Sequence, residues 1–369
     1  MRSNLRYAGR TRGGRTRGRG GQRGADHGVR CGGRGRVNRA GAWLQNYGVV
    51  VAFVLLLLIA AVFKGETFLT AVNIRNIVNQ NAAVGIIAVG MTLVIMTSGI
   101  DLSVGSALAL AAAVGIKLLN SQIDSGASQA TAVALALAAI LATGTAIGAL
   151  NGVLITFGRV APFIATLGGL VAFRSLTKVV AEGGQITAKG DVFDGLGHVG
   201  IPIPGTQMPN GQPVEVTWGI VLFAVVALAI GFLVRRTAFG RHVVAVGANE
   251  RAAVYSGINP RAVRLRVYTL MGLCVGLAAI VQGMRFNSVA SQQTGVFYEL
   301  YAIAAVVIGG TRLSGGKGRV WGTVVGVMIL AVITNLLILM NVPSEWQDFV
   351  QGVIILIAVL IQRGQSNRT

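Results

Sequence analysis

Residues 46–63 read NYGVVVAFVLLLLIAAVF, a run of 18 residues without a charged side chain. A helix rises about 1.5 Å per residue, so a run of this length nearly crosses a hydrocarbon core of about 30 Å. Nine further apolar runs follow it along the chain. The ten predicted spans are 46–63, 82–97, 104–119, 131–157, 163–179, 218–234, 265–284, 296–309, 320–340 and 349–361. We therefore predict an all-α fold, a polytopic membrane bundle of about ten transmembrane helices.

The composition supports a membrane protein and excludes an ordinary soluble domain. Hydrophobic residues make up 53% of the 369-residue chain and charged residues only 12%, whereas soluble domains average about 25% charged residues. The formal net charge of +20 is nevertheless high. It is concentrated near the start, because residues 1–40 hold 12 arginines and one aspartate, a net charge of +11 that leaves +9 for the rest.

Residues 1–40 are Gly/Arg-rich and have few large apolar side chains, so we predict a disordered arm. Three interpretations of it stay open: an arm that binds RNA or anionic lipid, a charged tail that fixes orientation, and a mis-assigned start with translation beginning downstream, for instance near Val37. No specific nucleic-acid partner is expected. Residues 41–363 are predicted to form the transmembrane domain, and residues 364–369 a cytoplasmic tail.

The loops between the predicted spans differ in charge. With the amino terminus inside, the inner side beyond residue 40 carries 13 basic and 2 acidic residues, and the outer side 7 basic and 9 acidic. Since Lys and Arg favour the cytoplasmic side, we expect both termini in the cytoplasm. The outer loop 181–217 is acidic and Pro-rich, which favours a structured cap or a docking surface over another span.

The junction 98–105, SGIDLSVG, places an aspartate and two hydroxyls between two apolar runs. An ionisable group near the membrane is costly and is functional by default, unless it lies at the interface. Asp101 and Ser103 are therefore candidates for a polar translocation path or a gate beside it. The alternative is structural, with either residue serving as the N-cap of the third span.

A short helix is predicted inside the strongly basic inner loop 235–264. Asn249 can cap it, Glu250 suits its first turn, Gly257 suits its C′ position and Pro260 stops it. Such a helix is either a simple linker or a docking element on the cytoplasmic face.

The remaining motifs exclude more than they assign. The segment 309–318, GGTRLSGGKG, lacks the spacing of a phosphate-binding loop and is interpreted as a tight basic turn. The two cysteines and three histidines form no metal-ligand or catalytic pattern, so we predict no catalytic residue, no metal and no cofactor. Asn81, Asn151 and Asn335 offer the donors and acceptors that a path for a neutral polyol needs, although hydrogen bonding between helices explains any one of them equally well.

Four separated segments carry a family resemblance. They are MTLVIMTSGIDLSVGS (91–106), APFIATLG (161–168), the segment 247–260, and AVVIGGT (305–311) with LSGG (313–316). Together they resemble the ribose/xylose/galactose-type permease subunits of bacterial ABC importers, over about residues 41–363.

The resemblance implies a function and partners. It implies a bacterial inner-membrane permease subunit that carries a monosaccharide or a related polyol and is not itself an enzyme. ATP hydrolysis is expected on a separate cytoplasmic ATPase subunit, and an extracytoplasmic sugar-binding protein, a second permease chain and membrane lipid are the other expected partners. Residues 249–257 correspond by position to a short cytoplasmic coupling helix. The expected ATPase-coupling residues are Gly247, Asn249, Glu250, Ala253, Gly257 and Pro260, and the expected path residues are Asn81, Asp101, Ser103, Asn151 and Asn335.

Two other classes of function remain open at this point. An ion-coupled secondary transporter or channel would need acids or histidines at mid-span, and apart from Asp101 the predicted spans offer almost none. A membrane-tethered RNA-binding protein would use the arm 1–40.

Overall fold

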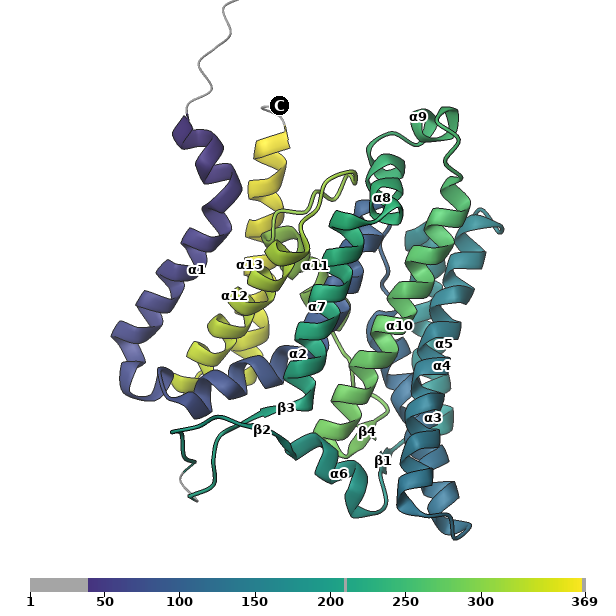
Figure 1. The fold of residues 1–369 in the computed structure, drawn as a ribbon, viewed down its shortest axis with the longest axis vertical. Helices are drawn as coiled ribbons and strands as arrows, with labels where there is room; N and C mark the ends of the chain where they lie inside the picture. Colours follow the sequence, from purple (N-terminus) through teal and green to yellow (C-terminus); the bar gives the residue numbers. More distant parts are fainter. Residues whose placement is uncertain (1–38, 209–210, 367–369) are drawn as a thin grey trace, which may run out of the picture. The chain divides into compact units, whose positions relative to one another are not determined.

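A computed structural model describes residues 39–208 and 211–366 of the chain. Contacts divide the chain into two units, Met1–Gln45 and Asn46–Thr369. In the first unit only the beginning of helix α1 (Arg39–Phe68) is described, so the prediction for residues 1–38 of the arm lies outside the described residues. The second unit holds the rest of α1 and every other described element (Figure 1).

The second unit consists almost entirely of helices, which confirms the predicted all-α membrane bundle. After α1 the helices are α2 (Ala71–Met96), α3 (Val104–Asp124), α4 (Gln129–Thr156), α5 (Pro162–Val180), α6 (Asp191–His198), α7 (Trp218–Arg236), α8 (Ala238–Ala248), α9 (Glu250–Tyr255), α10 (Pro260–Phe286), α11 (Tyr298–Ile308), α12 (Val320–Leu339) and α13 (Ser344–Ser366). The strands are β1 (Gln185–Thr187), β2 (Gly200–Pro202), β3 (Glu215–Thr217) and β4 (Ser288–Ala290). β1 pairs antiparallel with β4, and β2 with β3.

Among the described residues, eight helices are long and apolar enough to cross a membrane: α1, α2, α3, α4, α5, α7, α10 and α12. Each matches one of the ten predicted spans. The other two predicted spans fall on α11 and α13. α11 has 11 residues, which is short of the roughly 20 that a bilayer requires. α13 has 23 residues, but it begins with the polar run Ser344–Asp348 before its apolar part.

The long helices are buried to very different degrees. Most of α2, α3 and α10 is buried, whereas little of α1, α5 and α7 is buried, and their exposed side chains are mostly apolar. Exposed apolar side chains are expected where a helix faces lipid or another chain. α2, α3 and α10 therefore form the centre of the bundle.

Small residues bring several helices into close contact, as expected in lipid. Gly144 and Gly148 of α4 face Gly272 and Gly276 of α10, and an added Cβ would collide with the opposite backbone. In the same way, Gly322 of α12 lies against the backbone of Gly309, just after α11. The repeated glycines of the sequence thus mark the closest helix crossings.

The eighth predicted span, 296–309, differs from the structure in form. After β4 the chain continues through the non-helical residues 291–297 and becomes helical only at Tyr298. Ser291 is 1% exposed, and the backbone of Gly295 packs against that of Gly105 at the start of α3. Non-helical backbone inside a membrane protein is tolerated where it is buried in protein or lines a cavity. A non-helical segment thus replaces the first part of the expected helix; it is buried at Ser291 and Gly295 and exposed on either side of Gly295.

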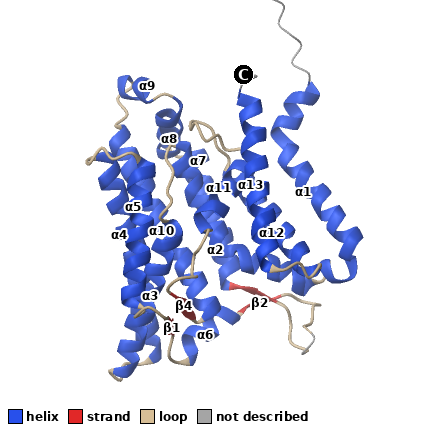
Figure 2. Ribbon diagram, turned by 180° about the vertical axis from the view of Figure 1, so that it is seen from behind, coloured by secondary structure: helices blue, strands red, loops and turns tan. Residues whose placement is uncertain are grey.

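The two ends of the bundle carry different structures. α8 and α9 lie at one end, and the strands and α6 lie at the other (Figures 1 and 2). The predicted outer loop 181–217 forms α6 and three of the strands, which confirms that it is structured rather than another span. The predicted inner loop 235–264 forms α8, α9 and the start of α10.

Candidate functional site

The connection between α2 and α3 is a buried polar cluster built around Asp101. Asp101 is 3% exposed, and its Oδ1 accepts hydrogen bonds from the backbone N–H of Ser103 (2.9 Å) and from the Ser103 hydroxyl (2.7 Å). The Asn151 amide of α4 donates in turn to Ser103 Oγ (2.9 Å). The structure therefore brings three of the five expected path residues together, and we call Asp101, Ser103 and Asn151 the Asp101 cluster.

The cluster leaves one polar atom unused. Asn151 is 1% exposed, and among the described residues its Oδ1 finds no hydrogen-bond donor. A buried acceptor without a partner is costly, so such an atom requires a water or a ligand as its partner. It is the atom of the cluster best suited to receive a hydroxyl.

The alternative that the side chain of Asp101 or Ser103 caps α3 is wrong. Ser103 occupies the N-cap position of α3, but its hydroxyl makes no bond to a helix N–H and bonds to Asp101 instead. Asp101 closes a turn onto Ser103 rather than onto the helix. Both side chains therefore serve the cluster.

Burial also changes the acidity of the cluster. Asp101 lies in the connection, outside the spanning helices, and desolvation raises the pKa of its carboxyl, opposed by the hydrogen bonds from Ser103.

The connection is held from two more helices, since Ile100 O accepts from Thr166 of α5 (3.3 Å) and from Tyr268 of α10 (3.4 Å). Three helices thus fix the position of one short connection.

The other two expected path residues lie elsewhere. Asn81 donates to Ile77 O within α2 (2.9 Å). Asn335 of α12 exchanges two hydrogen bonds with Asn73 of α2, at 3.0 and 2.8 Å. At 1.5 Å per residue, Asn73 is roughly 36 Å along α2 from the connection at Thr97. Asn335 and Asn73 thus follow the interhelical interpretation, far from the Asp101 cluster.

The short helix predicted over 249–257 is present as α9. Asn249 Oδ1 caps it by accepting from Ala252 N (3.0 Å). Gly257, with φ of +78°, ends it, and Ile258 N and Gly257 N donate to Ala253 O and Val254 O (both 3.0 Å), the pattern of a Schellman motif. The prediction that Pro260 stops this helix is wrong. Pro260 instead begins α10, directly after the N-cap Asn259.

One side of α9 is held against α10. Glu250 and Arg264 form a two-pronged ion pair at 3.0 and 2.6 Å, and Ala253 is 3% exposed. The opposite side is free, since Tyr255 is 90% exposed. α9 therefore presents an exposed aromatic residue from a fixed position.

Three motifs that are far apart in sequence meet beneath α9. Gly316 N donates to Met96 O at the end of α2 (3.0 Å), and Ser98 Oγ donates to Ser314 O (2.9 Å). Gly247, at the end of α8, lies so close to Met96 O and Gly316 N that a Cβ has no room. We call Gly247, Gly315 and Gly316 the glycine junction. It joins α8 and α9 to the connection that carries Asp101.

Sequence reasoning missed two charged residues. Arg174 and Glu299 fall within the predicted spans 163–179 and 296–309, although the outer-side total of 7 basic and 9 acidic residues includes both. In the structure both are half-buried in helices, and Arg174 donates to Thr294 O (2.7 Å) and Ser291 O (3.3 Å), the carbonyls of the non-helical segment 291–297. Their place within predicted spans was the available signal, since a charge inside a span is functional by default.

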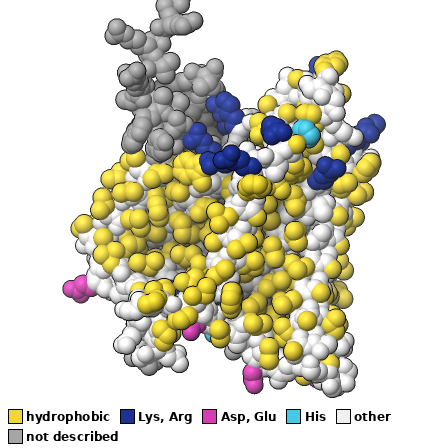
Figure 3. Space-filling view, viewed as in Figure 1, with side chains coloured by type: hydrophobic (Ala, Val, Ile, Leu, Met, Phe, Trp, Pro, Cys, Tyr) yellow, Lys and Arg dark blue, Asp and Glu magenta, His cyan; other side chains and the backbone are white. Residues whose placement is uncertain are grey.

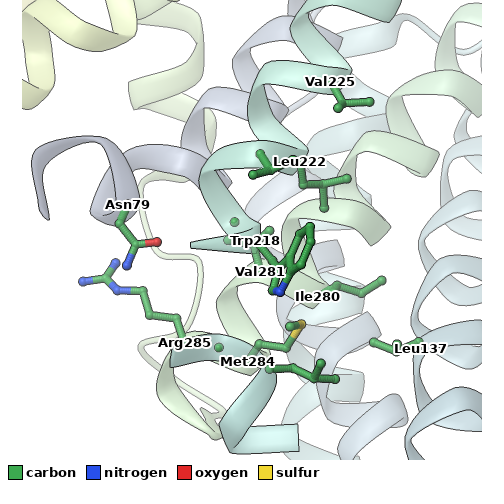
Figure 4. A pocket seen from close by; sticks show the side chains of 13 residues that line it. Asn79, Leu137, Trp218, Leu222, Val225, Ile280, Val281, Met284 and Arg285 are labelled. Carbon is green, nitrogen blue, oxygen red and sulfur yellow. The ribbon is translucent and has the colours of Figure 1, made fainter. Parts of the chain in front are cut away.

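A separate cavity of about 350 Å³ lies between α7 and α10. Figure 4 shows Trp218, Leu222, Ile280 and Met284 in its wall, with Asn79 and Arg285 to one side. Its lining is almost wholly apolar, so it offers few of the hydrogen bonds that a hydroxylated solute needs.

Comparison with known proteins decides the family. Residues 73–359 match the family described as the permease component of a branched-chain amino acid transport system. The chain belongs to this permease family. No solved structure matches it.

Curated relatives extend over nearly the whole permease. The ribose import permease protein RbsC of Escherichia coli (strain K12) is 41% identical over 324 residues, 87% of this chain and 94% of that protein. The RbsC protein of Bacillus subtilis (strain 168) is 41% identical over 328 residues, 88% and 94% of the two chains. The D-allose transport system permease protein AlsC of Escherichia coli (strain K12) is 35% identical over 314 residues, 84% and 90%. The resemblance to sugar-type permease subunits of ABC importers is thereby confirmed.

Membership of the family settles several expectations. The chain is a multi-pass membrane protein and a transport subunit rather than an enzyme. Permeases of ABC importers work with an ATPase and a substrate-binding protein, and ATP is hydrolysed on the ATPase. The ion-coupled alternative is correspondingly disfavoured.

Proposed function

We propose that the chain, over residues 41–363, forms the translocation path of an ATP-driven importer for a monosaccharide or a related polyol. The names of its relatives support this, since ribose and D-allose are both monosaccharides. The observation that carries the mechanism is the glycine junction, which joins the segment of α8 and α9 by backbone contacts to the start of the connection that carries the Asp101 cluster.

The coupling step uses the exposed side of α9. Closure of the ATPase dimer pushes on residues 249–257, with Tyr255 as the contact and Gly257 as the fixed end of the helix. The Glu250–Arg264 pair transmits the push to α10, and Gly247 transmits it to Met96. The connection 97–103 then moves as a gate on the cytoplasmic side of the path. Asp101, Ser103 and Asn151 supply donors and acceptors for sugar hydroxyls.

Substrate class is tested by ATP hydrolysis of the complete transporter in proteoliposomes. With each candidate substrate and a matching binding protein, we expect a monosaccharide to stimulate hydrolysis. Stimulation by leucine but by no monosaccharide would favour the broader family description over the proposal.

The coupling role of α9 is tested by the double change Glu250→Arg with Gly257→Pro. We expect association with the ATPase and sugar uptake to be lost. Arg251→Gln with Ser256→Ala, two exposed positions of the same segment, is the matched control. Intact association and uptake in the double variant would show that α9 is not the coupling element.

We also propose that both termini and α9 face the cytoplasm. In the view of Figure 3 the Lys and Arg side chains gather at the end that carries α8 and α9, and the Asp and Glu side chains lie toward the other end. Ser256→Cys just after α9 and Ser125→Cys just after α3 mark the two ends, in a background with Cys31→Ser and with the buried Cys274 retained. In whole cells an impermeant maleimide should label only the second, and labelling of the first alone would reverse the orientation.

Two proposals concern further parts of the complex. A second permease chain completes the path, supported by the exposed apolar sides of α5 and α7, and native mass spectrometry of the complex counts the chains directly.

The arm 1–40 is dispensable for transport, so deleting residues 1–36 should leave uptake unchanged. RNA crosslinked to the full chain would revive the alternative function.

A further inference from the structure

A second cavity, of about 370 Å³, opens beside α9 and is unlike the apolar one. Its walls come from the start of the 97–103 connection, the α4–α5 turn, and the beginnings of α9 and α10. Small-molecule sites commonly measure about 300–1,000 Å³, so this cavity can hold a compact solute. About half of its lining is polar.

The charged side chains in the cavity are mostly basic. Arg159, Arg261 and Arg264 line it together with a single carboxylate, Glu250. Arg264 is engaged with Glu250, whereas Arg159 and Arg261 have no ion-pair partner within the described part of the chain. Two positive charges therefore remain uncompensated. Arg159 also adopts φ of +54°, which few residues other than glycine adopt.

Hydroxyl groups complete the polar wall. Thr97, Ser98 and Thr156 donate their hydroxyl protons to backbone carbonyls, at 2.8, 2.9 and 2.6 Å. A hydroxyl that donates in this way still has lone pairs to accept with. The wall thus offers acceptors for the hydroxyl groups of a solute beside donors for an anion.

The cavity and the exposed side of α9 face different ways. Glu250 lies at the cavity, and Tyr255 is five residues further along. At about 100° per residue the two side chains are roughly 140° apart around the helix. A protein that docks on Tyr255 therefore leaves the cavity for another ligand.

We propose that this cavity binds a small cytoplasmic phosphate monoester that carries hydroxyl groups, such as a sugar phosphate. Arg159 and Arg261 bind the phosphate, because a planar guanidinium donates two parallel hydrogen bonds to its oxygens. A phosphate dianion matches the two uncompensated positive charges. The hydroxyls of Thr97, Ser98 and Thr156 receive the hydroxyl groups of the solute.

Binding has a consequence for coupling, which rests on the proposed function. The dianion repels Glu250 and competes with it for Arg264, so the ion pair that holds α9 against α10 loosens. A phosphorylated product that accumulates inside the cell then slows further import. The cavity is in this sense an inhibitory site on the cytoplasmic side.

Isothermal titration calorimetry of the full chain in neutral detergent tests binding without any transport step, so its failure and that of the transport function are distinguishable. The probes are glucose 6-phosphate, inorganic phosphate and glucose. We expect glucose 6-phosphate to bind most tightly, inorganic phosphate more weakly, and glucose not at all. Arg159→Gln with Arg261→Gln should weaken binding by at least about tenfold, since two charge-assisted contacts are lost.

Arg235→Gln with Arg236→Gln is the matched control, because these exposed arginines at the end of α7 lie outside the cavity. It should bind like the parent chain. Equal losses in both double variants would mean general attraction to a basic surface and would overturn the proposal. The proposal would also be overturned if the parent chain bound no phosphate and the Arg159→Gln, Arg261→Gln variant lost association with the ATPase. That result would assign the two arginines to a protein partner.

Discussion

The Asp101 cluster and the glycine junction lie at two ends of one short connection, but they are built differently. The cluster is made by side chains that exchange hydrogen bonds over 2.7–2.9 Å. The junction is made by backbone atoms, where Gly247, Gly315 and Gly316 leave no room for side chains. A side-chain contact tolerates a substitute with the same donors and acceptors, whereas a backbone contact tolerates no added atom. The first can rearrange around a solute, and the second can transmit a displacement.

The largest effect on stability is expected at the junction. Gly247→Ala places a methyl group against the backbone of Met96 and Gly316, and overpacking of this kind costs about 1–3 kcal/mol. Gly352→Ala is the matched control, since it lies in helix α13 with open space around it. There alanine should be neutral or stabilising by up to about 1 kcal/mol. Thermal unfolding of both variants in detergent checks the difference, and equal melting temperatures would remove the distinction between junction and cluster.

At the cluster the expected effect depends on the substitute, and only its upper end reaches the effect at the junction. Asp101→Asn keeps an acceptor for Ser103, whereas Asp101→Leu leaves buried donors unpaired at a cost of about 1–3 kcal/mol. The melting temperature should therefore fall for the leucine variant and hold for the asparagine variant. If both variants fell equally, the charge of Asp101 rather than its hydrogen bonds would hold the connection.

The pH dependence of Asp101 sharpens this test. Burial raises the pKa of its carboxyl in the folded state, so its favourable contribution is present below the unfolded pKa of about 3.9 and is lost as pH rises through the folded value. Asp101→Asn should therefore gain stability relative to the parent chain as pH rises from 4 to 7. A melting temperature of Asp101→Asn that falls relative to the parent chain, or keeps a constant difference from it, over this range would contradict the raised pKa.

The smallest effect is expected at the Asn73–Asn335 pair. It is also made of side chains, but it lies far from the connection. Interhelical polar pairs in membrane proteins couple by about 0.6 kcal/mol on average. A double-mutant cycle with Asn73→Leu and Asn335→Leu measures the coupling, and uptake should be unchanged. A loss of uptake in either single variant would return Asn335 to the path.

Sequence patterns within a single segment correctly predicted the helices and turns of that segment. Apolar runs located the eight long helices, and Asn249 and Gly257 located α9, because caps and turns depend on neighbouring residues. The sequence also singled out Asp101 and the Gly-rich segment 309–318, but as separate motifs.

Contacts between distant segments could not be predicted in this way. Asn151 lies 48 residues from Ser103, and nothing in either motif specifies the other. A glycine in the sequence indicates that space is short, but it does not indicate which backbone segment lies against it. The contact of Gly247 with Met96 therefore could not be predicted from the sequence. The run 296–309 was apolar enough for a span, yet its helix begins only at Tyr298, after Gly295 has packed against the backbone of Gly105.

The central claim is that α9 acts on the Asp101 cluster through the glycine junction. The most direct test measures sugar uptake and ATP hydrolysis together, in proteoliposomes that hold the complete transporter with Gly247→Ala or Gly352→Ala. If the junction transmits the push, Gly247→Ala should keep its ATP hydrolysis but import far less sugar per ATP, while Gly352→Ala should match the parent chain. An unchanged ratio of sugar imported to ATP hydrolysed in Gly247→Ala would contradict the claim.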